Sequence, residues 1–364
     1  MKKNIHKKNR RQFGVTLIEL MVSVAISLFL IAVIGGAYIT ARNVFASTAA
    51  ASGMDENVRV AFSMIGTSIR QASFNGCAGV TGTVKGDTRG ANYYGSNWYQ
   101  DFTKPVQSNS APGLNNLPTG KIGDMLTLIG VDPTREASVV SDEDGIIQTG
   151  THDFNEGDVL LAMTTDCSLN SYFVMTNDGS NTTIPHKSSG TNDSHNCNAD
   201  LGINCAEGGS STPYGHLARG ALILPVVANA YFIADSASAN KGKSLWRRTY
   251  GVKGNSGKAV WSGDGQDEEL INGVENMALE FGIDSDGDRS IDGYATLGDV
   301  TDWNKVLAVR IHLLIATLPD AGTRSIRSTN YRPIDPDHPI FTPPTDNRIY
   351  REYTSIFALR NRIL

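Results

Sequence analysis

The chain has 364 residues, a formal net charge of −5, and 40% apolar and 19% charged residues. This length allows one large domain or two modest ones. The 37 glycines favour strands and loops over a helical bundle, and the charge balance excludes a broadly basic surface of the kind that binds nucleic acid.

The first predicted element is an uncharged segment at residues 20–39, which is long enough to span a bilayer as a helix. The basic residues before it place the N-terminus in the cytoplasm and everything after Arg42 across the membrane. A cleaved secretory signal with its cut near residues 49–51 is the alternative, but such signals have shorter apolar cores of roughly 7–15 residues. The basic residues are Lys2, Lys3, Lys7, Lys8, Arg10 and Arg11.

Glu19 stands at the entrance to this segment. A carboxylate deep in a bilayer costs roughly 2.5–3.5 kcal/mol, so its position calls for a reason. One interpretation places Glu19 at the hydrated interface, where its charge suits a helix N-terminus.

The residues around Glu19 favour a second interpretation. The basic leader, Gly14, the letters "VTLIEL" and the uncharged segment together resemble the signal of type IV prepilins. The resemblance implies that a prepilin peptidase cuts between Gly14 and Val15 and that Val15 is then N-methylated, although most members of the family have Phe there. It also implies that Glu19 neutralises the new α-amino group of a neighbouring subunit as a filament grows. The family includes a subunit type that lacks this glutamate and is expected at the extreme tip, and the presence of Glu19 implies that this chain is not of that type.

The helix is predicted to continue well past the apolar segment, because residues 37–73 contain no proline. A one-sided apolar stripe at helical spacing should seat its second half on a sheet. The predicted organisation is a leader at 1–14, an apolar helix at 15–52, an amphipathic helix at 53–75 and a β-rich head at 76–364. The stripe is formed by Met54, Val58, Phe62, Ile65 and Ile69.

Short apolar runs bounded by turn residues predict the strands of the head. Residues 221–234 should form a strand that Pro225 interrupts, and residues 244–250 should form an edge strand or a hairpin arm. In residues 306–316 apolar side chains alternate with others, which predicts one buried face and a solvent-facing His312. The remaining strand candidates are residues 125–131, 159–163, 172–175 and 277–283.

An aromatic island, "NYYGSNWY", occupies residues 92–99. We expect these rings to pack over the sheet of the head. Binding of a sugar or of another subunit is the alternative.

The four cysteines, if exported to an oxidising compartment, predict two disulfides. Three pairings are possible. The short loop between Cys197 and Cys205 favours that pair, which leaves Cys77 with Cys167. Zinc binding with help from His186 and His195 is the alternative, but the spacing fits no common zinc pattern.

An aspartate-rich loop near residue 288 is a candidate calcium site, because Ca²⁺ takes 6–8 oxygen ligands in irregular geometry. The loop departs from the EF-hand pattern, with Arg289 in place of Gly and Ala295 in place of Glu. An acidic hairpin that binds no ion is the alternative. The proposed ligands are Asp284, Asp286, Asp288, the carbonyl of Ser290, and Asp292.

No catalytic motif is recognised. The stretch "GVKGNSGKAV" fails as a phosphate loop because of Val252 and Ala259, and the seven histidines are scattered. We expect no enzyme and no required cofactor, and a membrane-tethered hydrolase is the alternative.

The blocks "LEFGIDSDGD" and "FALRNR" resemble the PilW group of minor pilins. The resemblance implies an α+β pilin-like fold and a role in priming a type IV pilus at or near its tip, for twitching motility, adhesion or DNA uptake. It implies that the protein spans the inner membrane with a periplasmic head and then enters the pilus. The implied partners are other minor pilins, the major pilin, a PilY-type adhesin and the peptidase, without direct nucleic-acid binding. A J-like pseudopilin of type II secretion and a tethered ligand-binding protein are the alternatives.

Overall fold

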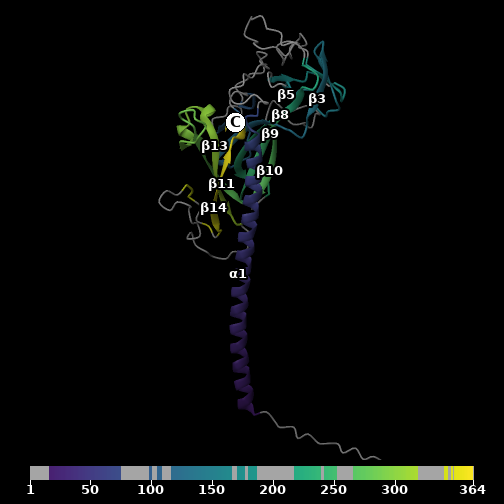
Figure 1. Cartoon of the computed structure of the whole chain (residues 1–364). Helices are drawn as coiled ribbons and strands as arrows, with labels where there is room; N and C mark the ends of the chain where they lie inside the picture. The colour runs from purple at the N-terminus through teal and green to yellow at the C-terminus, as the bar shows by residue number, and fades with distance from the viewer. Residues whose placement is uncertain are drawn as a thin grey trace, which may run out of the picture.

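The computed structural model describes residues 16–74, 98–100, 105–108, 116–165, 170–176, 179–186, 217–238, 242–251, 265–318, 340–342, 346 and 348–363. One long helix, α1 (Leu17–Gln71), projects from a globular head built of two antiparallel sheets (Figure 1). The α+β pilin-like architecture predicted from the sequence is confirmed.

The two halves of α1 lie in different surroundings. All of its buried residues lie in its second half, on one face, because their spacing of three and four residues returns to the same side of a helix. The stripe predicted from the sequence is thus confirmed, with Phe62 half-buried. The helix ends at Gln71, where the backbone N–H of Ala72 donates to the carbonyls of Ser68 and Ile69. Its buried residues are Met54, Val58, Ala61, Ile65, Gly66 and Ile69.

Fourteen strands are described in the head. They are β1 (Val106–Ser108), β2 (Ile122–Val131), β3 (Ala137–Glu143), β4 (Ile146–Thr149), β5 (Val159–Met163), β6 (Asn170–Val174), β7 (Thr183–Pro185), β8 (Leu222–Asp235), β9 (Lys243–Tyr250), β10 (Gln266–Asn272), β11 (Val274–Ile283), β12 (Gly293–Thr296), β13 (Val306–Ala316) and β14 (Tyr350–Ala358). Short helical elements are η1 (Trp98–Gln100), η2 (Leu297–Asp299), η3 (Trp303–Lys305) and α2 (Arg360–Ile363).

The strands form a ten-stranded sheet organised around β8 and a four-stranded sheet in the order β12-β11-β13-β14. The chain passes from the first sheet to the second at Gly273, between β10 and β11, where a φ of 84° favours glycine. Because β9 pairs with both β8 and β10, it is a hairpin arm within the sheet and not an edge strand.

Pro225 does not interrupt β8, contrary to the prediction from the sequence. It marks the point where β8 changes partners: residues 222–225 pair with β5, and the residues after them pair with β2 and β9. A proline has no N–H to donate, so it is tolerated where a ladder changes partners. Its carbonyl still accepts a hydrogen bond from the N–H of Asp132 at 2.9 Å.

The second half of α1 packs into the main core, which the inner faces of both sheets complete. A close backbone contact lies at Gly130 of β2, where Ala72 forms a bridge and a β-carbon would lie 2.8 Å from the carbonyl oxygen of Gln71. Glycine at this position lets the end of the helix touch the strand.

His312 is buried, at 6% exposure, and does not face solvent as the alternation predicted. Its ring Nε2 lies 3.1 Å from Glu280, and its Nδ1 lies 2.9 Å from the hydroxyl of Thr354. Both faces of β13 are therefore covered. The main apolar core covers one face; the polar contacts of Arg310 and His312 and a small apolar cluster around Leu314 and Ala316 cover the other.

The described part of the aromatic island is buried. Trp98 and Tyr99 pack against Tyr250 of β9, with the two tyrosine rings stacked 4.0 Å apart between centroids. These two rings cover the sheet, as expected, and offer no surface for a ligand.

Candidate functional site

The start of α1 is capped by its own side chains. Thr16 is the N-cap, and its hydroxyl accepts from the N–H of Glu19 at 3.3 Å. The Glu19 carboxylate in turn accepts from the N–H of Thr16 at 3.3 Å and from its hydroxyl at 3.4 Å. This reciprocal capping box satisfies donors that the first turn leaves free. Gly14 and Val15 lie outside the described residues.

The first half of α1 exposes an apolar surface on all sides. Leu17, Phe29 and Tyr38 are about 70% exposed or more, and the helix is long and apolar enough to cross a membrane. The hydroxyls of Ser23 and Ser27 donate to helix carbonyls at 2.9 and 2.7 Å, which satisfies their donors without solvent. An apolar helix of this length is soluble only in lipid or against other helices.

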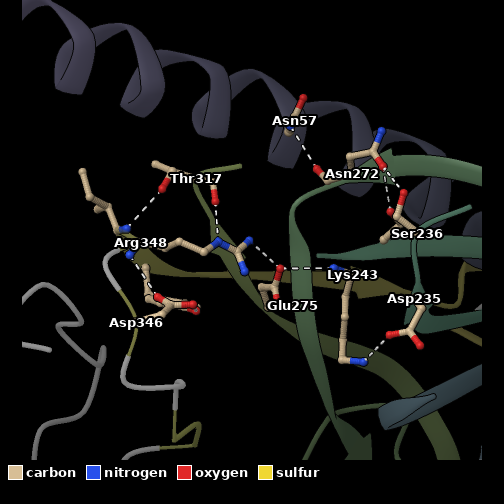
Figure 2. Close-up of polar contacts among 12 residues, drawn as sticks. Asn57, Asp235, Ser236, Lys243, Asn272, Glu275, Thr317, Asp346 and Arg348 are labelled. Carbon is tan, nitrogen blue, oxygen red and sulfur yellow. Dashed lines mark hydrogen bonds and ion pairs between the residues drawn. The ribbon is translucent and has the colours of Figure 1, made fainter. Parts of the chain in front are cut away.

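Polar contacts hold α1 where it enters the head. The Asn57 side chain donates to the carbonyl of Asn272, at the turn between the two sheets (Figure 2), over 3.2 Å. The Asn272 side chain accepts from the hydroxyls of Ser236 and Ser244, both at 2.9 Å. Asn272 therefore joins the helix to β9 and to the end of β8 in the ten-stranded sheet.

A nearly buried ion pair ties the end of the chain to this same region (Figure 2). The guanidinium of Arg348 donates to Glu275 of β11 at 2.5 Å and to the carbonyl of Thr317 at 2.6 Å. Glu275 also accepts from the N–H of Lys243 at 3.2 Å. Removal of one partner from such a pair leaves an uncompensated charge and costs roughly 3–5 kcal/mol.

The last residues of the chain clamp the other end of α1. The Asn361 side chain donates to the carbonyls of Arg70 and Ala72 at 3.2 and 3.0 Å, which caps the helix C-terminus. Arg362 is buried and donates to Ser73, Val306 and Trp303. Burial lowers the pKa of Arg362 to about 10. The sequence pattern drew attention to this block only through resemblance, and it gave no sign of the contact with α1.

A polar groove of about 730 Å³ runs between α1 and the ten-stranded sheet. Its wall on the helix carries Ser63, Met64 and Thr67, and its floor carries Asn229 and Thr249, joined by a 3.0 Å hydrogen bond.

The aspartate-rich loop brings together three of its four carboxylates. One oxygen each of Asp284, Asp286 and Asp292 lies within 4.8 Å of the others, whereas Asp288 lies outside this group and accepts from the N–H of Ser290. The Asp284 carboxylate accepts from two backbone N–H groups at 2.6 and 2.9 Å, and hydrogen bonds from Ser285 lower the pKa of Asp292. The ligand set is all oxygen and anionic, which fits the chemistry of calcium.

The cysteines, Cys77, Cys167, Cys197 and Cys205, lie outside the described residues, as does His195. His186 is buried, with its Nε2 3.1 Å from Asp142. The structure thus places this histidine in the packing of the head.

Comparisons with known families match two parts of the chain. Residues 230–361 match the family described as Type IV Pilus-assembly protein W, and residues 9–35 match the prokaryotic N-terminal methylation motif. Neither the curated proteins nor the solved structures include a significant match. The first match spans the end of β8, the strands β9 and β10, the four-stranded sheet, and the C-terminal clamp as far as Asn361. Together the two matches support a type IV pilus minor pilin of the PilW family.

Proposed function

We propose that this protein is a minor pilin that helps to start the growth of a type IV pilus and then stays at or near its tip. The observation that carries the proposal is the division of α1. Its first half exposes an apolar surface, and its second half is fixed in the head by a buried face and by polar contacts at both ends. Such a helix can move from a bilayer into a bundle of like helices without unfolding the head.

The proposed maturation step is cleavage between Gly14 and Val15 by prepilin peptidase, followed by methylation of Val15. Since α1 begins at Leu17, this bond precedes the helix in the chain. The methylation motif at residues 9–35 supports the step.

The proposed role of Glu19 is to pair with the α-amino group of a neighbouring subunit. Its present contacts, at 3.3–3.4 Å, are long for charge-assisted hydrogen bonds. In apolar surroundings an ammonium group would be the stronger partner. Glu19 can therefore exchange its own cap for the amine of the next subunit.

The proposed topology has a cytoplasmic leader, α1 in the inner membrane and a periplasmic head, which becomes extracellular in the pilus. The proposed partners are other minor pilins, the major pilin, a PilY-type adhesin and the peptidase. The family match points to a structural protein and not to an enzyme.

N-terminal sequencing of the protein from pili tests the proposal. We expect a methylated Val15 as the first residue. Gly14→Ser should leave a longer, uncleaved precursor in the membrane. A mature chain that begins elsewhere would refute the maturation step, and a chain absent from purified pili would refute the assembly role.

A J-like pseudopilin of type II secretion would share all of this membrane chemistry. The PilW match favours the pilus. Deletion of the gene should abolish pili and leave protein secretion intact, and the reverse result would favour the pseudopilin.

We also propose that Asp284, Asp286 and Asp292 bind calcium. Three carboxylates within 4.8 Å repel one another, and a divalent cation would remove that repulsion. The thermal midpoint should rise with calcium relative to chelator, and the rise should vanish in Asp286→Asn. An unchanged midpoint in the wild type would reject the site.

The pairs Cys197–Cys205 and Cys77–Cys167 remain our proposed disulfides. Peptide mapping under non-reducing conditions would reveal them, and free thiols or another pairing would contradict the assignment.

A further inference from the structure

Residues 133–224 are inserted into a simple hairpin of the head. β2 and β8 pair up to Val131 opposite Val226, and the next backbone contact, from Asp132 N–H to the Pro225 carbonyl, is 2.9 Å long. The chain therefore leaves and returns at adjacent points, where a tight turn could have joined the two strands.

This insertion forms a lobe with a core of its own. Side chains from β3, β4, β5, β6, β7 and the start of β8 make one cluster that contains no residue of α1 or of the four-stranded sheet. The lobe also lies outside residues 230–361, which match the PilW family. Figure 1 shows β3 and β5 at the end of the molecule farthest from the start of α1.

The inserted segment has a larger net negative charge than the whole chain. Residues 133–224 contain twelve Asp and Glu against three Lys and Arg, a formal charge of −9, whereas the whole chain carries −5. Among its described residues, seven are acidic and two are basic, and one of the basic residues, Arg135, is paired with Asp153 at 2.9 Å. A field of this sign attracts basic surfaces and repels nucleic acids and anionic lipids.

A second, independent feature marks one face of the lobe. Val140 of β3 and Ile146 of β4 are 49% and 39% exposed, while their neighbours Val139 and Ile147 are buried in the core of the lobe. The pairing shifts register between Val139 and Ser141, so Val140 lies at a bulge, and this bulge brings its exposed side chain to the same outer face as Ile146. Glu143 pairs opposite Ile146 on that face. Exposed aliphatic and acidic side chains therefore lie together on this face.

We propose that the outer face of the β3–β4 hairpin, formed by Val140, Glu143, Asp144, Ile146 and Gln148, docks a protein partner with a basic and partly apolar surface. In this proposal, α1 and the rest of the head take part in pilus assembly, and the lobe binds the partner. The acidic residues speed and orient the encounter, and the aliphatic side chains supply apolar area that the partner covers. This proposal depends on the proposed function in one respect only: the head must move away from the membrane.

Photo-crosslinking in cells tests the docking surface in the full-length protein. Gln148 is exposed on the outer face, so a benzophenone amino acid is placed there. It should form an adduct with one protein, and the crosslinked peptide of that protein should carry a net positive charge. The double variant Glu143→Gln/Ile146→Thr should lower the adduct yield about fivefold or more, as should high salt. Thr keeps the β-branched shape, so the hairpin should remain folded.

The matched control is Asp299→Asn/Ile356→Thr, which removes one exposed acid and one exposed aliphatic residue from the four-stranded part of the head. It should leave the yield unchanged, and both variants should assemble as many pili as the wild type. Adducts only with lipid, polysaccharide or nucleic acid, no adduct, or equal yields in the two variants would overturn the docking surface. Loss of the chain from pili in the wild type would instead refute the proposed function.

Discussion

Glu19 makes one set of contacts within the subunit and, on our proposal, a stronger one between subunits. Its capping box shows that the carboxylate needs no partner to be satisfied in an isolated chain. The sequence suggested the two interpretations as alternatives. On our proposal, they describe successive states of the same side chain.

Substitution of Glu19 separates these two roles. Glu19→Gln can keep the capping box, because Gln serves at the third helical position, but it removes the charge. Glu19→Ala removes both. We expect both variants to insert into the membrane and to enter pili at least about tenfold less than the wild type, since loss of one partner from a desolvated pair costs roughly 3–5 kcal/mol. Immunoblots of sheared pili measure this, and normal incorporation of the Gln variant would refute the ion pair.

Glu280 gives the head a specific dependence on pH. Burial alone would raise its pKa, but hydrogen bonds and charge from His312 and Arg310 outweigh burial and hold the pKa below its ordinary value. A carboxyl whose folded pKa is lowered stabilises the fold above its unfolded pKa of about 4.3 and loses that contribution as the pH falls through the folded value.

The melting temperature of Glu280→Gln should therefore change less between pH 7 and pH 3 than that of the wild type. The variant should be less stable than the wild type at pH 7 and closer to it at pH 3. Scanning fluorimetry of the detergent-solubilised protein provides the measurement, with Asp299→Asn as an exposed control. A constant gap between variant and wild type across this range would contradict the role of Glu280.

Among the elements, those with a strong period were the predictable ones. The helical stripe from Met54 to Ile69 and the alternation in β13 follow from spacing, and β2 and β5 follow from apolar runs bounded by turn residues. The short, polar strands of the inserted lobe, β3, β4 and β7, were not predicted, because few of their residues alternate and their pairing is set by tertiary contacts. His312 was misplaced for a related reason: a polar network can bury a strand face that looks solvent-exposed in sequence.

The contact between α1 and β2 depends on the absence of a side chain at Gly130. A β-carbon there would lie 2.8 Å from the Gln71 carbonyl oxygen and 3.1 Å from its carbon, and both are backbone atoms that cannot turn aside. We expect Gly130→Ala to destabilise the protein by about 1–3 kcal/mol, as overpacking does. Gly298→Ala is the control, because nothing lies within 4 Å of the added carbon.

The midpoint of urea unfolding of the two glycine variants in detergent would measure this cost. The Gly130 variant should unfold at lower urea with an unchanged slope, and the control should match the wild type within error. Equal midpoints would mean that the end of α1 is free to move away from β2.

For the molecule as a whole, the sequence predicted the division into a membrane segment and a head. It did not predict the contacts that hold α1 in the head. Apolar length and charge revealed the first half of α1, whereas the turn at Asn272, the Arg348–Glu275 pair and the C-terminal clamp join residues far apart in the chain. No local pattern encodes such contacts. Cleavage at Gly14 and Val15 stays a prediction, since both lie outside the described residues.

The boundary predicted between residues 52 and 53 leads to the final prediction. Every buried residue of α1 lies at Met54 or beyond. A chain that begins at Gly53 should therefore fold without detergent, remain monomeric and keep the melting temperature of the full-length head within about 3 °C, because it loses no buried contact.

A chain that begins at residue 63 is the matched comparison. It loses the buried Met54 and Val58, worth roughly 1.5–3 kcal/mol each, the buried Ala61, and the contact between Asn57 and Asn272. Its melting temperature should fall by about 5 °C or more, since each kcal/mol shifts a protein of this size by roughly 2–4 °C. Size-exclusion chromatography and scanning fluorimetry distinguish the two chains. Aggregation of the chain that begins at Gly53 would show that the apolar half of α1 also supports the head. Equal stability of the two chains would show that residues 53–62 do not help to anchor α1 in the head.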